Sequence, residues 1–366
     1  MIYKTFLRPL LFLGDAEKTH EQTLAILSKL GFLEGALESI YRVEDERLQV
    51  KIGSLTFPNP VGLAAGFDKN GRAIRTWPGF GFGFMEIGAV TAHPQPGNPK
   101  PRLFRLPKDQ ALINRLGFNN DGAEKIGNRL KTPKKNSKPA RIPLGINIGR
   151  TKIVENKDAV ADYLFTFETL YPYGDYFTLN VSSPNTPNLR ELQERGYLLE
   201  LLAAIQAKNQ ELAGKSKTER KPVLVKIAPD MELNQLDQIV EIIMDQRVAG
   251  VIATNASAFL RERLVVQNSE PGGLSGRPLR DKATFFIRHI YKTTGGKLSI
   301  VGSGGIFTAE DAYEKITAGA TAVQIYTGFV YEGPALVKRI NQGLVNLINR
   351  DGFSDISKAV GSQTLP

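Results

Sequence analysis

From residue 59 onward, short apolar runs rich in Val, Ile, Ala and Gly alternate with longer amphipathic stretches. This alternation is typical of βα units, in which each buried parallel strand is followed by a helix that covers it. Eight candidate strands occupy residues 60–66, 84–90, 143–149, 176–182, 222–228, 249–255, 299–305 and 321–327. A helical stretch fits after each strand, with clear examples at residues 159–171, 198–213, 236–246, 309–319 and 334–350. Eight such repeats predict an α/β protein with a closed TIM (β/α)8 barrel, and an open doubly wound sheet is the structural alternative.

The N-terminal forty residues follow another pattern. Apolar side chains in residues 2–13 lie at roughly helical spacing, with Pro9 as a break or kink. Asp15 is placed to cap a second helix that ends at Gly31, and a third apolar stretch covers residues 32–41. The pattern predicts a small N-terminal helical extension. It leaves two interpretations open, a helical cap on the main core or an interfacial patch whose apolar face enters lipid.

Small or polar residues stand at the carboxyl ends of nearly all predicted strands. In a barrel these ends open onto one face, where active sites are built. The set comprises Gly66, Asp68, Lys69, Asn147, Asn180, Ser182, Ser183, Lys226, Thr254, Asn255, Gly302 to Gly305, Tyr326 and Thr327. Each alone suits a cap or turn, but their joint occurrence indicates one site.

The amino-acid composition excludes several kinds of catalytic and metal site. The 366 residues include no cysteine and three histidines, which excludes disulfides, thiolate nucleophiles and Fe–S clusters, and no metal site is expected. A net charge of +10 suits a nucleic-acid binder, a surface attracted to anionic lipid or an enzyme of anionic substrates. No apolar run reaches the roughly 18 residues of a membrane-spanning helix. The N-terminus lacks a secretory cleavage pattern, so we expect the protein to stay in the cytoplasm.

A glycine-rich segment predicts an anion site. Residues 301–312 (VGSGGIFTAEDA) form a strand, a turn and a helix beginning near Thr308, where backbone N–H groups and a helix N-terminus can converge on a phosphate. Residues 272–276 (GGLSG), with Tyr326 and Thr327, can add donors. An isolated glycine-rich turn is equally often structural, so the position in the repeat carries the prediction.

Lys226 and a group of asparagines indicate a planar polar ligand. Lys226 is the one cation in an apolar strand, and we expect it to meet an anionic group, such as an electron-accepting cofactor ring, or to form a Schiff base. Asn147, Asn180, Asn185 and Asn255 suit a ring with carbonyl and N–H edges.

Ser183 lies on a loop stiffened by Pro184 and Pro187. No histidine is near it in sequence, so a hydrolase-type triad is not supported. Taken alone, this serine is more often a turn or cap residue.

With these motifs assembled, the chain resembles the quinone-dependent, membrane-associated class of dihydroorotate dehydrogenase. The similar segments follow in order across about residues 2 to 345, and they include NPVGLAAGFDKNG, INRLGFNNDG, PLGINIG, NVSSPNTPNLRELQ, VLVKIAPD, GVIATN, GGLSGRPLRD, GSGGI and AGATAVQIYTGF. The resemblance divides the chain into an N-terminal helical membrane and quinone-access extension (1–45), an FMN-binding barrel (46–350) and a C-terminal tail (351–366).

The resemblance also implies roles for residues. FMN is expected to contact Ala64, Ala65, Gly66, Asn147, Asn180, Lys226, Thr254, Ser275, Gly276, Gly304, Gly305, Tyr326 and Thr327. Dihydroorotate, the substrate, is expected to contact Lys69, Asn114, Gly117, Phe118, Asn180, Asn185 and Asn255. Ser183 is implied as the catalytic base, with Thr186 and Phe118 shaping and shielding it. Lys69 is expected to pair with the orotate carboxylate.

The electron acceptor follows from the same resemblance. The soluble classes use a cysteine base, and one of them passes electrons to a separate Fe–S subunit, so the cysteine-free chain is expected to have no such partner. A membrane quinone is expected to enter between the N-terminal helices and reach the flavin near His20, Arg105 and Tyr326. This implies peripheral contact with the bilayer at the cytoplasmic side of the cell membrane.

Two departures affect fine substrate geometry. Ala89 and Ala256 stand where hydroxyl residues are usual, so we expect a hydrogen bond on the substrate or phosphate side either to be lost or to be supplied by Ser257 or Thr91. Two rival functions remain at this point, another FMN barrel enzyme that acts on a different pyrimidine and a nucleic-acid-binding protein. The second is motivated only by charge, and no nucleic-acid partner is expected because no aromatic-basic motif accompanies it.

Overall fold

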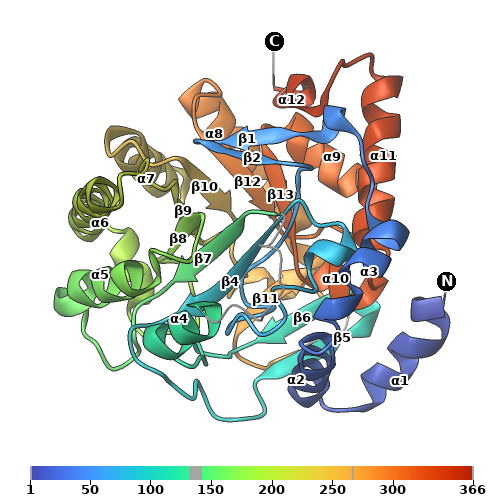
Figure 1. The fold of residues 1–366 in the computed structure, drawn as a ribbon, viewed down its shortest axis with the longest axis horizontal. Helices are drawn as coiled ribbons and strands as arrows, with labels where there is room; N and C mark the ends of the chain where they lie inside the picture. The colour runs from blue at the N-terminus through green and yellow to red at the C-terminus, as the bar shows by residue number, and fades with distance from the viewer. Residues whose placement is uncertain (1, 132–141, 266–267, 365–366) are drawn as a thin grey trace.

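A computed structural model describes residues 2–131, 142–265 and 268–364. Its centre is a closed barrel of parallel strands with helices around the outside (Figure 1). The barrel strands are β3 (Val61–Leu63), β4 (Phe84–Val90), β7 (Leu144–Ile148), β8 (Tyr176–Asn180), β9 (Val223–Ile227), β10 (Gly250–Ala253), β12 (Ser299–Ser303) and β13 (Ala322–Ile325). They are ordered as they follow in sequence, and β13 pairs with β3 through Val323 and Val61. The predicted TIM barrel is therefore confirmed and the open sheet is wrong.

The outer helices are α4 (Ala123–Lys131), α5 (Ala159–Leu170), α6 (Arg195–Ser216), α7 (Leu233–Asp245), α8 (Arg280–Thr294), α9 (Ala309–Thr317), α10 (Thr327–Glu332) and α11 (Leu336–Arg350). One prediction is wrong, because β3 is followed by no α-helix. The connection to β4 contains only a short 3-10 helix, Pro78–Phe80. Glycines interrupt this segment, and Gly66, Gly71 and Gly81 have positive φ, which an α-helix cannot accommodate.

A second sheet lies over the carboxyl end of the barrel, and the sequence pattern did not predict it. Its strands β5 (Leu103–Leu106), β6 (Ala111–Asn114) and β11 (Gly273–Gly276) are antiparallel, with β6 in the middle. Ser275 of β11 pairs with Leu112 of β6, far away in sequence. This sheet forms one wall of the barrel mouth.

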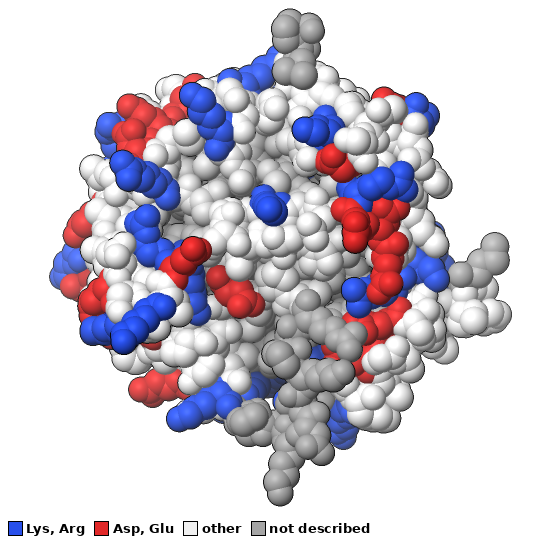
Figure 2. Space-filling view, turned by 45° about the horizontal axis from the view of Figure 1, so that its top comes forward, with Lys and Arg blue, Asp and Glu red and all other residues white. Residues whose placement is uncertain are grey.

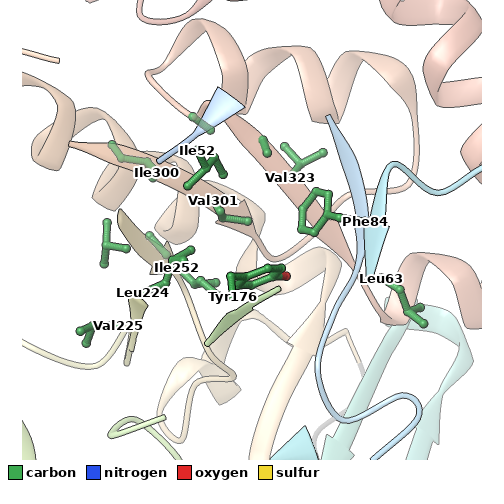
Figure 3. Packing of buried hydrophobic residues seen from close by; sticks show 14 of the residues in the cluster. Ile52, Leu63, Phe84, Tyr176, Leu224, Val225, Ile252, Ile300, Val301 and Val323 are labelled. Carbon is green, nitrogen blue, oxygen red and sulfur yellow. The ribbon is translucent and has the colours of Figure 1, made fainter. Parts of the chain in front are cut away.

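The opposite end of the barrel is closed by a hairpin of β1 (Val50–Ile52) and β2 (Leu55–Phe57). Ile52 and Phe57 are buried, and the Phe57 ring stacks on Phe84 at 4.7 Å between centroids. Figure 3 shows Ile52 beside Phe84, Tyr176 and Val301 in the barrel interior. Because apolar side chains fill this end, polar chemistry is confined to the other end.

The N-terminal extension comprises a π-helix (Tyr3–Leu7), α1 (Arg8–Leu13), α2 (Ala16–Leu27) and α3 (Glu34–Tyr41). Asp15 caps α2 as predicted, because its side chain accepts a hydrogen bond from the Lys18 backbone N–H at 2.8 Å. The predicted end at Gly31 is wrong, since α2 stops at Leu27 and the chain tightens into 3-10 turns. Gly31 instead permits close approach to the barrel, because a Cβ there would lie 3.1 Å from the Cβ of Arg75.

The chain after Arg350 packs back on the molecule. A short helix, α12 (Ile356–Ala359), buries both of its terminal residues. The Gly361 backbone N–H then donates to the Ile316 carbonyl at 3.0 Å. On the face in Figure 2, basic side chains are interspersed with acidic ones, so the net positive charge is spread and forms no single tract there.

Candidate active site

A cavity of about 1070 Å³, including its open mouth, lies at the carboxyl end of the barrel strands. Its lining comprises Ala64, Ala65, Gly66, Lys69, Ala89, Leu103, Leu112, Asn114, Leu116, Gly117, Phe118, Asn180, Ser183, Pro184, Asn185, Lys226, Thr254, Asn255, Ala256, Ser275, Gly276, Leu279, Ser303, Gly304, Gly305, Ile306, Gln324, Ile325, Tyr326, Thr327 and Gly328. The structure thus brings together almost all residues predicted for the site. The predicted residues outside this lining are Asn147, His20 and Arg105, together with Asp68, Ser182, Gly302 and Thr186.

Asn147 lies one layer behind the cavity wall. It is fully buried, and its Nδ2 donates to Glu86 Oε1 at 2.9 Å. Its Oδ1 accepts a hydrogen bond at 3.1 Å from Asn180 Nδ2. Asn147 therefore does not line the cavity itself but is hydrogen-bonded to Asn180, which does.

Ser183 lies in the loop after β8 and is 5% exposed. Its Oγ accepts a hydrogen bond from the Asn185 backbone N–H at 3.3 Å. The loop is anchored by Arg190, which donates to the Ser182 carbonyl at 3.3 Å and to Asp230 at 2.9 Å. An anchored loop holds the Ser183 hydroxyl in one position at the cavity wall.

Thr186 adds a second hydroxyl to this loop. Its Oγ1 is buried and has no hydrogen-bond partner among the described residues. A buried hydroxyl without a partner is costly, so this atom is available to a bound molecule or a water.

Asparagine side chains form one polar end of the cavity. Asn185 Nδ2 donates to Asn114 Oδ1 at 3.3 Å, and Asn255 Nδ2 donates to Ser182 Oγ at 3.0 Å. Lys69 donates to Asn119 Oδ1. Burial, together with the positive charge of Arg102, lowers the pKa of Lys69 to about 7. A ligand carboxylate at this end would supply the anion that the buried ammonium lacks.

Lys226 enters the cavity from β9 and is 6% exposed. Burial lowers its pKa, and the negative charge of Glu86 opposes that effect. A cation in such a position stabilises negative charge that develops on a bound ring.

The glycine-rich end has the geometry of an anion cradle. Gly276, Gly304 and Gly305 have φ values of 103°, 122° and 72°, and a Cβ on Gly305 would lie 2.5 Å from the Arg280 Cβ. Ser275 and Thr327 exchange a hydroxyl hydrogen bond of 2.9 Å beside them. These positions need glycine, because only a backbone without side chains can bend and approach so closely.

The predicted helix N-terminus at this cradle needs correction. Thr308 and Asp311 form a capping box, in which each side chain accepts a hydrogen bond from the other residue's backbone N–H. Thr308 is also outside the cavity lining, whereas Thr327 and Gly328 of α10 are within it. The strand-end glycines therefore line the predicted anion site, but the helix that begins there is α10.

A second, smaller pocket lies between α2 and the barrel, lined by Glu17, His20, Glu21, Leu24, Gly66, Phe67, Asp68, Lys69, Asn70, Arg72, Leu103, Leu116, Asn119 and Tyr326. It shares Gly66, Lys69, Leu103, Leu116 and Tyr326 with the main cavity. Burial lowers the pKa of His20 to about 4, so its imidazole is neutral at physiological pH. Arg105 is in neither lining, because its guanidinium lies 4.7 Å from the Phe12 ring centroid and donates to the Gly14 carbonyl at 3.0 Å.

The proposed substitutes for two missing hydroxyls are unavailable. Ala89 and Ala256 both line the cavity. Ser257 is buried and donates to Asp230, and Thr91 donates to the His93 carbonyl at 2.6 Å. The wall is therefore apolar at these two alanines, and the suggestion that Thr91 or Ser257 replaces them is wrong.

Sequence reasoning missed several residues of the site. Leu103 and Leu112 come from the antiparallel sheet that was not predicted, and Leu116 comes from the segment that follows β6. Glu86 and Gln324 lie inside strands that were predicted, and both are polar residues within apolar runs, a signal that would have marked them.

The fold and the cavity together define a (β/α)8-barrel enzyme with a site for a planar ligand that carries an anionic group. The model of the dihydroorotate dehydrogenase family matches residues 47–348. A dihydroorotate dehydrogenase (quinone) from Gloeobacter violaceus is 50% identical over 356 residues, covering 97% of each chain. Another from Acaryochloris marina is 47% identical over 381 residues, covering 99% of this chain and 100% of that protein.

A solved structure of a DHODH is also similar to this chain. DHODH from Eimeria tenella, crystallised with ferulenol, superposes with a TM-score of 0.84 at 37% identity and covers 94% of this chain and 96% of its own. The chain belongs to the dihydroorotate dehydrogenase family, in its quinone-type group. It is accordingly an oxidoreductase of pyrimidine biosynthesis, from a family that generally uses a flavin.

Proposed function

We propose that this chain oxidises dihydroorotate to orotate with FMN as its flavin and a membrane quinone as the final electron acceptor. The observation that carries the proposal is the single cavity in which Ser183, the asparagine cluster, Lys226 and the glycine cradle meet. Two hydrogens leave the substrate, one as a proton from C5 and one as a hydride from C6, and the quinone becomes a quinol.

FMN fits the residues present. The glycine cradle accepts a phosphate group, and Gln324 Oε1 is a buried acceptor without a partner among the described residues. The residues that would hold FMN are Ala64, Ala65, Gly66, Asn180, Lys226, Thr254, Ser275, Gly276, Gly304, Gly305, Tyr326 and Thr327, with Asn147 supporting Asn180 from behind. When bound, FMN supplies the acceptor for the hydride from C6.

Dihydroorotate occupies the asparagine end, against Lys69, Asn114, Gly117, Phe118, Asn180, Asn185 and Asn255. Lys69 pairs with the substrate carboxylate, and the amides bind the carbonyl and N–H edges of the ring. This arrangement fixes the carbon that loses its proton relative to Ser183.

Ser183 removes the C5 proton. An unactivated hydroxyl is a weak base, so its contribution depends on orientation in an enclosed site and is typically of order 10²–10⁴-fold. Phe118 shields the site from water, and the unpartnered Thr186 hydroxyl is positioned in the same loop to continue a hydrogen-bond chain from Ser183.

The quinone enters through the second pocket. His20 and Tyr326 line this pocket, and Tyr326 also lines the main cavity, so the two spaces lie on either side of shared residues. Arg105 contributes at the outer side, where it packs on Phe12 of α1. Residues 1–45 thus act as a quinone-access extension of the barrel at 46–350, with the tail at 351–366.

The extension lies on the membrane surface at the cytoplasmic side. Its outer side exposes Ile2, Phe6, Leu10 and Leu13 by 65–84% of their surface. Such a run of exposed apolar residues on short helices suits shallow insertion at the lipid interface. Among the described residues, no helix combines the length and apolar composition required to cross a bilayer.

The identity of the final electron acceptor tests this proposal. Purified protein with dihydroorotate is offered a ubiquinone analogue, fumarate or NAD⁺ in separate assays. We expect turnover with the quinone and less than about a hundredth of that rate with the other two. Preferred reduction of fumarate or NAD⁺ would contradict the quinone assignment.

A further inference from the structure

Glu86 is a fully buried carboxylate inside the barrel, on β4 and outside the cavity lining. Its oxygens accept hydrogen bonds from Asn147 Nδ2 at 2.9 Å, Thr178 Oγ1 at 2.9 Å, Gln324 Nε2 at 3.1 Å and Tyr176 Oη at 3.3 Å. These partners come from β7, β8 and β13, so one carboxylate joins four strands of the barrel. Four donors around two oxygens are the surroundings of an ionised carboxylate.

An ionised carboxylate only accepts hydrogen bonds, and this fixes the orientation of the amides that face it. Asn147 must turn its NH₂ group toward Glu86 and its Oδ1 away. That Oδ1 then requires a donor, and Asn180 Nδ2 provides it at 3.1 Å. Glu86 therefore determines which end of the Asn180 amide faces Asn147.

The orientation of donors and acceptors that Glu86 sets extends to the residues of the cavity wall. With its NH₂ directed at Asn147, Asn180 presents Oδ1 on the other side, where it accepts from Ser182 Oγ at 3.0 Å and Asn255 Nδ2 at 3.4 Å. Asn180 and Asn255 both line the cavity. Their donor and acceptor positions thus follow from the charge on Glu86, two or three hydrogen bonds away.

Glu86 also orients a second amide side chain, that of Gln324. Its Nε2 donates to Glu86, so its Oε1 is turned the other way. This oxygen is buried without a partner among the described residues, and Gln324 lines the cavity. A buried acceptor kept unpaired is costly unless a ligand N–H satisfies it.

We propose that Glu86 is a positioning residue that sets the hydrogen-bonding direction of the amides around the ligand cavity, acting through Asn147 and Gln324. The inference rests on the proposed function, because the ligands affected are FMN and the pyrimidine substrate. Glu86 touches neither ligand. Its negative charge also lies within electrostatic range of Lys226 and supports the ammonium form of that side chain.

The experiment compares Glu86→Gln with Glu86→Asp. Glutamine keeps the size of the side chain but can donate as well as accept, so the direction of the amide chain is no longer fixed. Aspartate is shorter but still only accepts. We expect E86Q to lose about tenfold in orotate affinity, measured by titration of the flavin absorbance, and E86D to bind more tightly than E86Q. A role in packing alone predicts the reverse order, because E86Q preserves volume and E86D leaves a cavity.

A second site and a control complete the test. Asn147→Leu interrupts the same series of hydrogen bonds one residue closer to the cavity. The losses of orotate affinity in N147L and in E86Q should therefore not add in the double variant. Tyr176→Phe removes only the longest bond to Glu86, and we expect it to bind orotate within about twofold of the parent. If E86Q does not fold, the orotate affinities of N147L and Y176F are compared instead, and N147L is expected to bind orotate more weakly than Y176F.

Additive losses, or E86Q binding orotate as the parent does, would overturn the role of Glu86. A parent protein that binds neither FMN nor orotate would instead overturn the proposed function. The two failures are therefore distinguishable in one set of titrations.

Discussion

At the scale of the residue, the site depends on polar groups that are buried and only partly satisfied. Lys69 and Lys226 line the cavity without an acidic side chain in hydrogen-bond contact, and the Thr186 hydroxyl is buried without a partner among the described residues. Burial of polar groups normally costs stability, and natural sites retain such groups because a ligand completes them.

The first prediction concerns Ser183. Ser183→Ala removes one buried oxygen from the wall and no group that would contact the cofactor. We expect the variant to keep its flavin and to lose turnover by about 10²–10⁴-fold at neutral pH, measured with dihydroorotate and a quinone analogue. Flavin content, from the absorbance spectrum, is the control for folding. Turnover equal to that of the parent would remove Ser183 from the mechanism.

The second prediction is a pH dependence that originates in Lys69. Burial lowers its pKa to about 7 in the free protein, and only the ammonium form pairs with a carboxylate. Orotate should therefore bind most tightly below pH 7, and its affinity should fall by up to about tenfold per unit above pH 7 until the raised pKa of the complex is reached. Titrations between pH 6 and 8 measure this slope. Lys69→Met should bind more weakly with a flat profile, and the same slope in that variant would assign the titration to another group.

Sequence reasoning worked well for these residues where a local pattern carried the information. Lys226 was identifiable as a cation in an apolar strand, and Gly304 and Gly305 as a turn between a strand and a helix. Glu86 and Gln324 could have been marked as polar residues in apolar strands, but their contacts could not be predicted, because their partners lie on strands far apart in sequence. The partners of Ser257 and Thr91 were equally invisible, since they depend on how loops pack.

At the scale of the element, a buried ion pair is among the contacts that join the extension to the rest of the described chain. Arg102 precedes β5 and donates to Glu17 of α2 at 2.7 and 3.0 Å, and each side chain is 6% exposed. Burial raises the pKa of Glu17, but hydrogen bonds and charge from Arg102 outweigh this and lower it below 4.5. The ion pair therefore contributes fully above pH 4.5 and is lost as the pH falls through the lower folded value.

The third prediction follows from this ion pair. Glu17→Gln leaves Arg102 buried without its anion, at a cost of about 3–5 kcal/mol. We expect α2 to detach more readily, so that protease cleaves the extension faster and turnover with a long-chain quinone falls more than turnover with a soluble dye. Lys4→Gln is the matched control, because the exposed Lys4–Glu332 pair also joins the extension to the barrel but is worth at most about 1 kcal/mol. Equal effects in the two variants would contradict the role of the buried pair.

The fourth prediction concerns the outer side of α1. Leu10 and Leu13 are 66% and 84% exposed. Their double substitution by Glu should reduce co-sedimentation with lipid vesicles at least about tenfold and leave flavin content unchanged, since each buried leucine contributes roughly 1.5–3 kcal/mol. Leu199→Glu, on α6 at the opposite side of the barrel in Figure 1, is the control and should bind vesicles as the parent does. Unchanged vesicle binding of the double variant would refute the membrane contact.

Elements could be predicted from sequence to the extent that their signals are local. All eight barrel strands were located, since each is a short apolar run between glycines and polar residues. The sheet of β5, β6 and β11 was missed because β11 pairs with a strand about 160 residues earlier, and no periodicity records such a pairing. The helix expected after β3 is absent because glycines and Pro78 interrupt the segment.

At the scale of the whole molecule, one end of the barrel is closed and the other is chemically active. The β1–β2 hairpin and the apolar side chains in Figure 3 fill the amino-terminal end. The carboxyl end is covered by the antiparallel sheet and the extension, and two pockets that share lining residues are found there. Under the proposed function, substrate oxidation belongs to the main cavity and quinone reduction to the pocket beside α2.

The most direct test of that division is an anaerobic titration of the purified protein loaded with FMN. The proposed function predicts that dihydroorotate bleaches the flavin absorbance with one equivalent per site, and that a ubiquinone analogue restores it. A protein that takes up no FMN, or whose flavin stays oxidised with excess dihydroorotate, would contradict the central claim.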